Sequence, residues 1–176
     1  VIVVGDEGPA MFSDDLGKTW LPLDDKVSHW EAKGAKGIIA KDDVFLIAKG
    51  DGEQVLRSTD GGMSWTAHPL GIRRALGRSF GLSVVKDEFW VTGDNARASK
   101  DGVTWRDLPA STPAGRFEVS DQGTIINVNR KRHSILRSTD GKTWQEVYQF
   151  TPSPDAHGGV QGFADVAFGK VKQIAE

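Results

Sequence analysis

The sequence predicts an all-β protein built from repeated sheets of four short strands. Three observations support this prediction. Glycine accounts for 21 of the 176 residues, about 12% against an average near 7%. Tryptophan occurs 6 times and tyrosine once, and one phrase that ends in tryptophan recurs along the chain. Glycine-rich turns between short apolar runs are typical of proteins made of many short strands.

The recurring phrase reads Ser-x-Asp-x-Gly-x-Ser/Thr-Trp, and its last two copies are one residue shorter. Its tryptophans lie 45, 40 and 39 residues apart. A period of about 40–45 residues is the size of one four-stranded blade of a β-propeller. A helical repeat of this length would need long segments with a 3.6-residue period, and the sequence has none. The four copies consist of Ser13, Asp15, Gly17, Thr19 and Trp20; Ser58, Asp60, Gly62, Ser64 and Trp65; Ser99, Asp101, Gly102, Thr104 and Trp105; and Ser138, Asp140, Gly141, Thr143 and Trp144.

Each period contains four predicted strands in a fixed order. The first is an apolar run that ends at a polar turn, in 36–41, 81–86 and 115–120. The second follows that turn, in 44–50, 89–94 and 124–129. The third leads into the phrase, in 54–59, 96–100 and 134–139. The fourth begins at the tryptophan, in 65–70, 105–109 and 144–150. Their alternating or fully apolar patterning indicates strands.

The two ends of the chain complement each other in this scheme. Residues 1–23 match the second, third and fourth strands of a blade, and 162–170 match a first strand. The sequence therefore predicts a single domain, residues 1–176, as a closed ring of four blades with one blade shared between the termini. The alternative is a fragment of a larger propeller. The predicted repeat units are 1–23 together with 160–176, 35–70, 79–109, and 114–150.

Every residue of the phrase has a structural role in a tight turn between two strands. The aspartate can accept hydrogen bonds from backbone N–H groups ahead of it, and the glycine permits a positive φ. The tryptophan is expected to bury its ring between neighbouring sheets. Successive turns lie on different blades, so the four aspartates are not expected to converge on one metal ion. The phrase also lacks the ligand run and closing glutamate of an EF-hand.

The phrase resembles the Asp-box, or BNR, repeat of a β-propeller superfamily that includes sialidases, sortilin-type receptors and many bacterial and phage propellers. The resemblance covers the four phrases from residue 13 to 144, with the flanking strands. It implies a propeller in which these turns lie on the face away from the ligand. It says little about function, because the members of the superfamily have unrelated activities. The usual locations of these proteins favour an extracellular or virion-associated setting. The sequence itself contains no signal that indicates a compartment.

The sequence lacks the catalytic motifs of the sialidases. It has no Arg-Ile-Pro motif, and "GIRR" at 71–74 does not match one. The single tyrosine, Tyr148, falls in a predicted wall strand rather than a central pocket. We therefore expect no catalytic residues. A glycan-acting hydrolase with two carboxylates in the central funnel is the enzymatic alternative.

Composition argues against several other classes of function. A net charge of −2 gives no general attraction to nucleic acid or to anionic membranes, and no apolar run is long enough to span a membrane. The chain has no cysteine, and its four histidines show no metal-ligand spacing. It also lacks a phosphate-binding glycine loop. No metal or cofactor is therefore expected.

The predicted ligand-binding residues lie on the connections between blades and on the loops between the second and third strands, on the face opposite the phrases. These segments combine basic and aromatic side chains, which suits an acidic glycan or an acidic protein patch. Single-stranded nucleic acid would need more stacking aromatics. The alternative is that the arginines are solvated singly. The candidates are Trp30, Arg73, Arg74, Arg78, Arg97, Arg130 and Arg132.

Together these observations predict a non-catalytic binding or structural module that contacts a protein or an acidic glycan through its inter-blade loops. Two alternatives stay open. One is the glycan hydrolase described above. The other is an assembly module of a larger particle, such as a phage tail or a surface complex.

Overall fold

The computed structural model describes residues 1–5, 10–23, 35–49, 52–72, 80–129, 133–151 and 166–168. Within these ranges the regular structure is entirely β, in one three-stranded and three four-stranded antiparallel sheets. The prediction of an all-β fold built from successive blades is confirmed. The described residues contain no helix long and apolar enough to cross a membrane.

We number the sheets as blades in chain order. Blade one comprises β1 (Ile2–Val3), β2 (Met11–Phe12) and β3 (Leu21–Pro22). Blade two comprises β4 (Ala35–Lys41), β5 (Val44–Lys49), β6 (Gln54–Ser58) and β7 (Thr66–Pro69). Blade three comprises β8 (Gly81–Val85), β9 (Glu88–Thr92), β10 (Arg97–Ser99) and β11 (Arg106–Asp107). Blade four comprises β12 (Arg116–Val119), β13 (Ile125–Asn129), β14 (Ser134–Ser138) and β15 (Gln145–Gln149).

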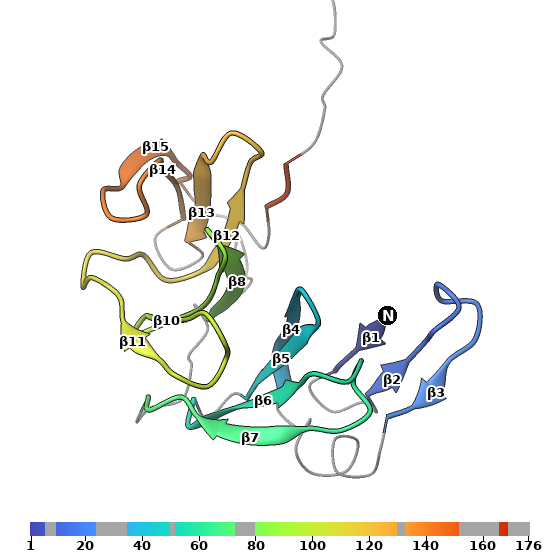
Figure 1. The fold of residues 1–176 in the computed structure, drawn as a ribbon. Helices are drawn as coiled ribbons and strands as arrows, with labels where there is room; N and C mark the ends of the chain where they lie inside the picture. The colour runs from blue at the N-terminus through green and yellow to red at the C-terminus, as the bar shows by residue number, and fades with distance from the viewer. Residues whose placement is uncertain are drawn as a thin grey trace, which may run out of the picture.

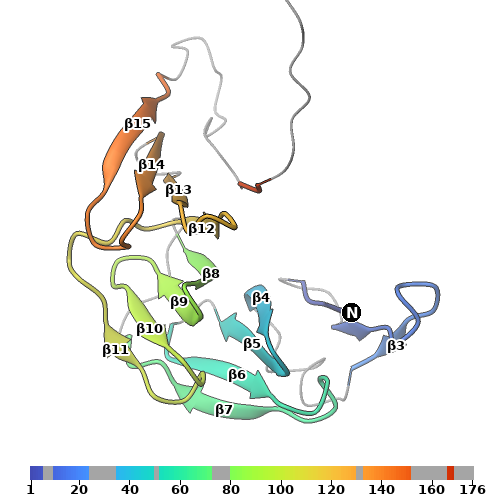
Figure 2. The same ribbon diagram turned by 45° about the horizontal axis from the view of Figure 1, so that its top comes forward.

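The blades follow one another along an arc, and blades one and four lie apart in both views (Figures 1 and 2). Within each blade, every strand pairs with the next strand along the chain. The first strands of blades two, three and four are β4, β8 and β12. They lie on the inner side of the arc, and β8 contacts both β4 and β12. The predicted C-terminal strand that would complete blade one lies largely outside the described residues, and 166–168 form no strand.

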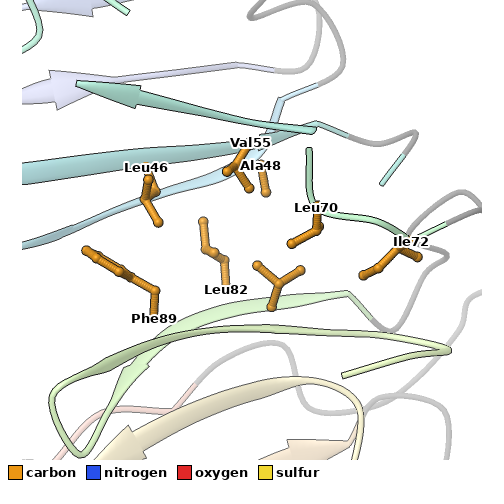
Figure 3. Packing of buried hydrophobic residues seen from close by; sticks show 8 residues of the cluster. Leu46, Ala48, Val55, Leu70, Ile72, Leu82 and Phe89 are labelled. Atoms are coloured by element: carbon orange, nitrogen blue, oxygen red, sulfur yellow. The ribbon is translucent and has the colours of Figure 1, made fainter. Parts of the chain in front are cut away.

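The largest cluster of buried apolar side chains lies between blades two and three. Leu46 and Ala48 of β5 face Leu82 of β8 and Phe89 of β9 (Figure 3). Ile47 alternates with them and packs on the opposite side, in the cluster shared with blade one. Because successive residues of a strand point to opposite faces, β5, which is apolar from Val44 to Ala48, packs on both sides and joins three blades.

Hydrogen bonds connect blade three to blade four. The Ser83 hydroxyl accepts a hydrogen bond from the Phe117 N–H at 2.9 Å, and the Thr92 hydroxyl donates to the Gly115 carbonyl at 2.7 Å. Both contacts link blade three to blade four in buried surroundings. They satisfy backbone groups that an inner edge strand would otherwise leave without a partner.

Candidate functional site

The four turns that hold the repeated phrase share one hydrogen-bond pattern. In the second turn the Ser58 hydroxyl donates to Asp60 at 2.8 Å and accepts from the Gly62 N–H at 2.9 Å. The Asp60 carboxylate also accepts the Ser64 N–H at 2.9 Å and the Ser64 hydroxyl at 2.5 Å. The serine–aspartate, glycine–serine and backbone–aspartate bonds recur in the other turns, which contain Asp15, Asp101 and Asp140.

These hydrogen bonds control the protonation of the turn carboxylates. Donors from the following Ser or Thr and from backbone N–H groups favour the ionised form. They lower the pKa of Asp15, Asp60 and Asp101 from 3.8 to about 2 and hold the pKa of Asp140 well below its usual range. The carboxylates are thus ionised at neutral pH and occupied within their own turns. The described residues contain no group of three or more His, Asp or Glu side chains that could hold a metal.

The turn tryptophans are more exposed than the sequence predicted. Trp20 is 38% exposed, and Trp65, Trp105 and Trp144 are half-buried rather than enclosed. In the first two turns the indole N–H donates to the turn glycine carbonyl, at 3.0 Å for Trp20 and 2.9 Å for Trp65. In the two shorter turns the indole N–H of Trp105 and of Trp144 is buried without a hydrogen-bond partner among the described residues. The first two turns are one residue longer than the last two, and this difference in length changes whether the indole N–H reaches the glycine carbonyl.

Arg97 is the one predicted ligand-binding residue that falls in the described part of the chain. It lies in β10, within the segment predicted as the third strand of blade three. Its guanidinium donates to the Leu70 carbonyl at 2.5 Å and to the Asp107 carboxylate at 2.8 Å. In this structure Arg97 thus joins blade three to the end of blade two. The other candidates, Trp30, Arg73, Arg74, Arg78, Arg130 and Arg132, lie outside the described residues.

A recess of about 240 Å³ lies between the inner strands of blades two, three and four. Five of its eight lining residues are apolar, but its lining surface is mainly polar, and Arg116 and Glu118 of β12 supply one cation and one carboxylate, both on exposed residues. The lining residues are Ile39, Ala40, Leu82, Ser83, Val84, Arg116, Phe117 and Glu118. A second recess, of about 260 Å³, lies at the third turn beside the ion pair between Arg106 and Glu88.

The sequence contained a partial signal for the inner recess. In "GRFEVS" (115–120) the charged residues Arg116 and Glu118 alternate with Phe117. A period of two places both charges on one face of a strand and the phenylalanine on the other. The recess itself was not predictable, because its walls come from three blades separated by about forty residues each.

The carboxylates that line the recess can be compared with those that glycoside hydrolysis requires. Hydrolysis of a glycoside by the usual route requires two carboxyl groups, about 5–10 Å apart, that face one pocket. Among its described lining residues the recess has a single carboxylate, Glu118. A surface that combines polar groups, a few apolar side chains and one charge of each sign is suited to holding a peptide or another extended polar ligand.

The arrangement of the blades is similar to that of solved β-propellers. YCF48 bound to a D1 peptide superposes with a TM-score of 0.59 and 18% identity, over 83% of this chain and 48% of that chain. Virginiamycin B lyase from Staphylococcus aureus gives 0.54 and 16%, over 88% and 56%. The GH74 enzyme of Niastella koreensis gives 0.53 and 19%, over 83% and 22%. No protein-family model matches the chain, and no curated protein sequence matches it.

These neighbours establish the propeller fold and leave the activity open. At these identities the similarity concerns the backbone alone. The chain spans about half the length of YCF48 and of the lyase. One neighbour holds a peptide and two are enzymes, so the same scaffold supports both binding and catalysis.

Proposed function

We propose that this chain is a non-catalytic binding module whose partner is a protein, held through an acidic segment of that partner. The observation that carries the proposal is the inner recess, where Glu118 is the single carboxylate among the described lining residues and Arg116 lies beside apolar side chains. Binding needs no paired acid and base, whereas glycoside hydrolysis does. The fold similarity to YCF48, which was solved with a peptide bound, supports the same class of ligand.

The connections between blades and the segment between β13 and β14 would form the second part of the proposed binding surface. Their basic side chains would attract an acidic segment and orient its carboxylates, since guanidinium groups form charge-assisted pairs with them. Trp30 would supply an aromatic contact. The proposed loop residues are Trp30, Arg73, Arg74, Arg78, Arg130 and Arg132.

We also infer that the four repeat turns are Asp-box turns. Support comes from the pattern Ser-x-Asp-(x)-Gly-x-Ser/Thr-Trp in the sequence and from the serine–aspartate and backbone–aspartate hydrogen bonds of each turn. In this role the aspartates fix the turn between the third and fourth strands of a blade. The ligand would then lie on another face of the propeller.

The binding proposal is tested by selecting peptides from a random display library against the immobilised protein. We expect the selected peptides to be rich in Asp and Glu. Arg116→Glu in the recess and the double variant R73E/R132E in the loops should each weaken their affinity at least about tenfold, because each replaces an attraction by a repulsion. Titration of the selected peptides by fluorescence anisotropy measures the change.

A matched control carries the same charge change on the opposite face. Lys18 and Lys142 are exposed residues of the first and fourth turns, and K18E/K142E should leave the affinity unchanged. Equal binding by all four proteins would contradict the proposed surface. Cleavage of any member of an acidic oligosaccharide panel by the wild-type protein would favour the hydrolase instead.

A further inference from the structure

The surface of the inner recess is mainly polar, although five of its eight lining residues are apolar. Its walls are β4, β8 and β12, and each of these strands stands at one end of its sheet and pairs with one neighbour. The backbone N–H and C=O groups on the other edge of such a strand point away from the sheet. That edge faces the inner side of the arc (Figure 2). Backbone groups therefore form part of the surface of the recess.

In blade four the preceding blade caps one of these inner-edge groups. The Phe117 N–H donates to the Ser83 hydroxyl of β8 at 2.9 Å, in buried surroundings. Phe117 stands opposite Asn127 of β13. Because its N–H points away from β13, these two residues form one of the pairs that exchange no hydrogen bonds in an antiparallel ladder. The serine hydroxyl thus satisfies a donor that the inner edge would otherwise leave without a partner.

Leu82 has the same position in blade three as Phe117 has in blade four. A two-residue turn joins β8 to β9, and the pair that flanks such a turn, Val85 with Glu88, is hydrogen-bonded. Hydrogen-bonded and non-hydrogen-bonded pairs alternate along an antiparallel ladder. Leu82 stands opposite Val91, three steps from that pair, so the two exchange no ladder hydrogen bonds. The Leu82 N–H therefore points to the inner edge.

The blade before Leu82 lacks the capping hydroxyl. Ser83 stands opposite Trp90 in blade three, and Ile39 stands opposite Leu46 in blade two. Trp90 and Leu46 are equivalent, because each is the nearest side chain to the Cβ position of the turn glycine in the following blade. Ile39 is therefore the repeat equivalent of Ser83. An isoleucine side chain has no hydrogen-bond acceptor, so this position cannot satisfy the Leu82 N–H.

Ile39, Leu82 and Arg116 line the same recess. We propose that the Leu82 N–H donates a hydrogen bond to a carboxylate of the partner's acidic segment. One carboxylate oxygen would take the role that the Ser83 hydroxyl has at the next junction, and the Arg116 guanidinium would add a charge-assisted contact. This inference rests on the proposed function. It adds a directional donor, Leu82, to the general attraction of Arg116.

Two substitutions of nearly equal shape at Ile39 test the proposal. Ile39→Thr places a hydroxyl beside the Leu82 N–H, as Ser83 does beside the Phe117 N–H, and Ile39→Val is the control without a hydroxyl. We expect Ile39→Thr to weaken the affinity for the selected acidic peptides at least about tenfold, because the ligand loses a hydrogen bond to a charged group. Ile39→Val should stay within about twofold of the wild type. Fluorescence anisotropy measures the affinities, and thermal melting checks the fold of both variants.

Acetate provides a probe that needs no selected peptide. We expect titration of the ¹⁵N-labelled protein with acetate, at constant ionic strength, to move the Leu82 amide proton downfield in the wild type and in Ile39→Val. The same amide should not respond in Ile39→Thr, where the new hydroxyl already accepts its hydrogen bond. The Phe117 amide should not respond in any of the three proteins, because Ser83 caps it. Acetamide, which is neutral, should move the Leu82 amide less than acetate does.

The outcomes separate this inference from the proposed function. If Arg116→Glu weakens peptide binding and the two Ile39 variants bind alike, the proposed function stands and the role of Leu82 is overturned. A wild-type Leu82 amide that ignores acetate, or responds equally to acetamide, would overturn it as well. If no acidic peptide is selected and the Leu82 amide still responds to acetate, the proposed function fails and the carboxylate-binding donor is supported.

Discussion

At the scale of single residues, each turn aspartate stabilises its own turn through hydrogen bonds. Asp60 accepts hydrogen bonds from the hydroxyl and N–H of Ser64 and from the hydroxyl of Ser58. All these donors lie within four residues along the chain. The carboxylate therefore organises its turn without help from other blades, and the same chemistry explains why the pKa of the carboxyl falls.

These pKa shifts make stability depend on acidity. The pKa of Asp15, Asp60 and Asp101 is lowered from 3.8 to about 2. Between these values the unfolded chain binds protons that the folded chain does not, so the folded state loses stability as the pH falls. We expect the urea midpoint to be constant above about pH 5 and to drop steadily towards pH 2. Urea titrations at half-unit pH intervals measure this.

One variant isolates the contribution of a single turn. Asp60→Asn should lower the urea midpoint at pH 6, and its difference from the wild type should shrink towards pH 2, where Asp60 itself becomes protonated. Asp14→Asn, at an exposed neighbouring aspartate in the first turn, should parallel the wild type at every pH. A difference for Asp60→Asn that does not vary with pH would show that the carboxylate charge is not what the turn uses.

At the scale of elements, the inner strands approach one another through glycine. Gly81 of β8 lies so close to the backbone of Gly115 that a Cβ would fall 1.7 Å from its carbonyl oxygen. The Thr92 hydroxyl donates to that same carbonyl. A side chain at this place can be accommodated only if blades three and four move apart, because a backbone atom cannot turn aside.

Gly81→Ala should therefore destabilise the protein strongly. We expect the free energy of unfolding to fall by at least about 1–3 kcal/mol, the usual range for overpacking a filled site. Gly37 is the matched control: it lies in β4, the equivalent inner strand, and the nearest atoms to its Cβ position are 3.9 Å away. Gly37→Ala should change the unfolding free energy by less than about 1 kcal/mol. Equal effects in urea denaturation would refute the close approach of blades three and four.

At the scale of the whole molecule, the blades differ in strand length and in the amount of apolar surface that they bury. The three strands of blade one have two residues each, whereas β8 and β9 have five each. The largest buried cluster lies between blades two and three. Stability within a fold follows local burial and hydrogen bonding, so blade one is the part that should open most easily.

Hydrogen exchange measures this gradient. The amides of Leu46 and Ile47 in β5 and of Val91 in β9, which are fully buried, should exchange only through global unfolding. The amides of β2 and β3 should exchange faster by several orders of magnitude, through local opening. Uniform protection across the four blades in mass-spectrometric exchange would mean that the arc unfolds as one unit.

Much of the strand pattern could be predicted because its signals are local. The segment predicted as a second strand at 44–50 is β5, Val44–Lys49, and that at 124–129 contains β13, Ile125–Asn129. Apolar runs bounded by polar turns determine such strands within a few residues. The fourth strand of blade three was predicted over 105–109 and spans only Arg106–Asp107, because the pairing with β10 ends there.

The candidate site was less predictable, since its parts come together across blades. Arg97 falls within the predicted third strand, but the sequence did not reveal that it donates to Leu70, 27 residues earlier. The recess at Arg116 and Glu118 also needs walls from β4 and β8. A contact of this kind depends on how one blade is rotated against the next, which no short window of sequence contains.

The sequence by itself determined the all-β class, the blade period and the chemistry of the four turns, because each depends on residues close together along the chain. Tertiary structure alone decided that Trp20 is exposed, that Arg97 joins two blades, that Gly81 and Gly115 meet, and that the blades follow an arc. The physical reason is that packing between blades sums many weak contacts among residues far apart in the chain. Their outcome depends on the shapes of both surfaces.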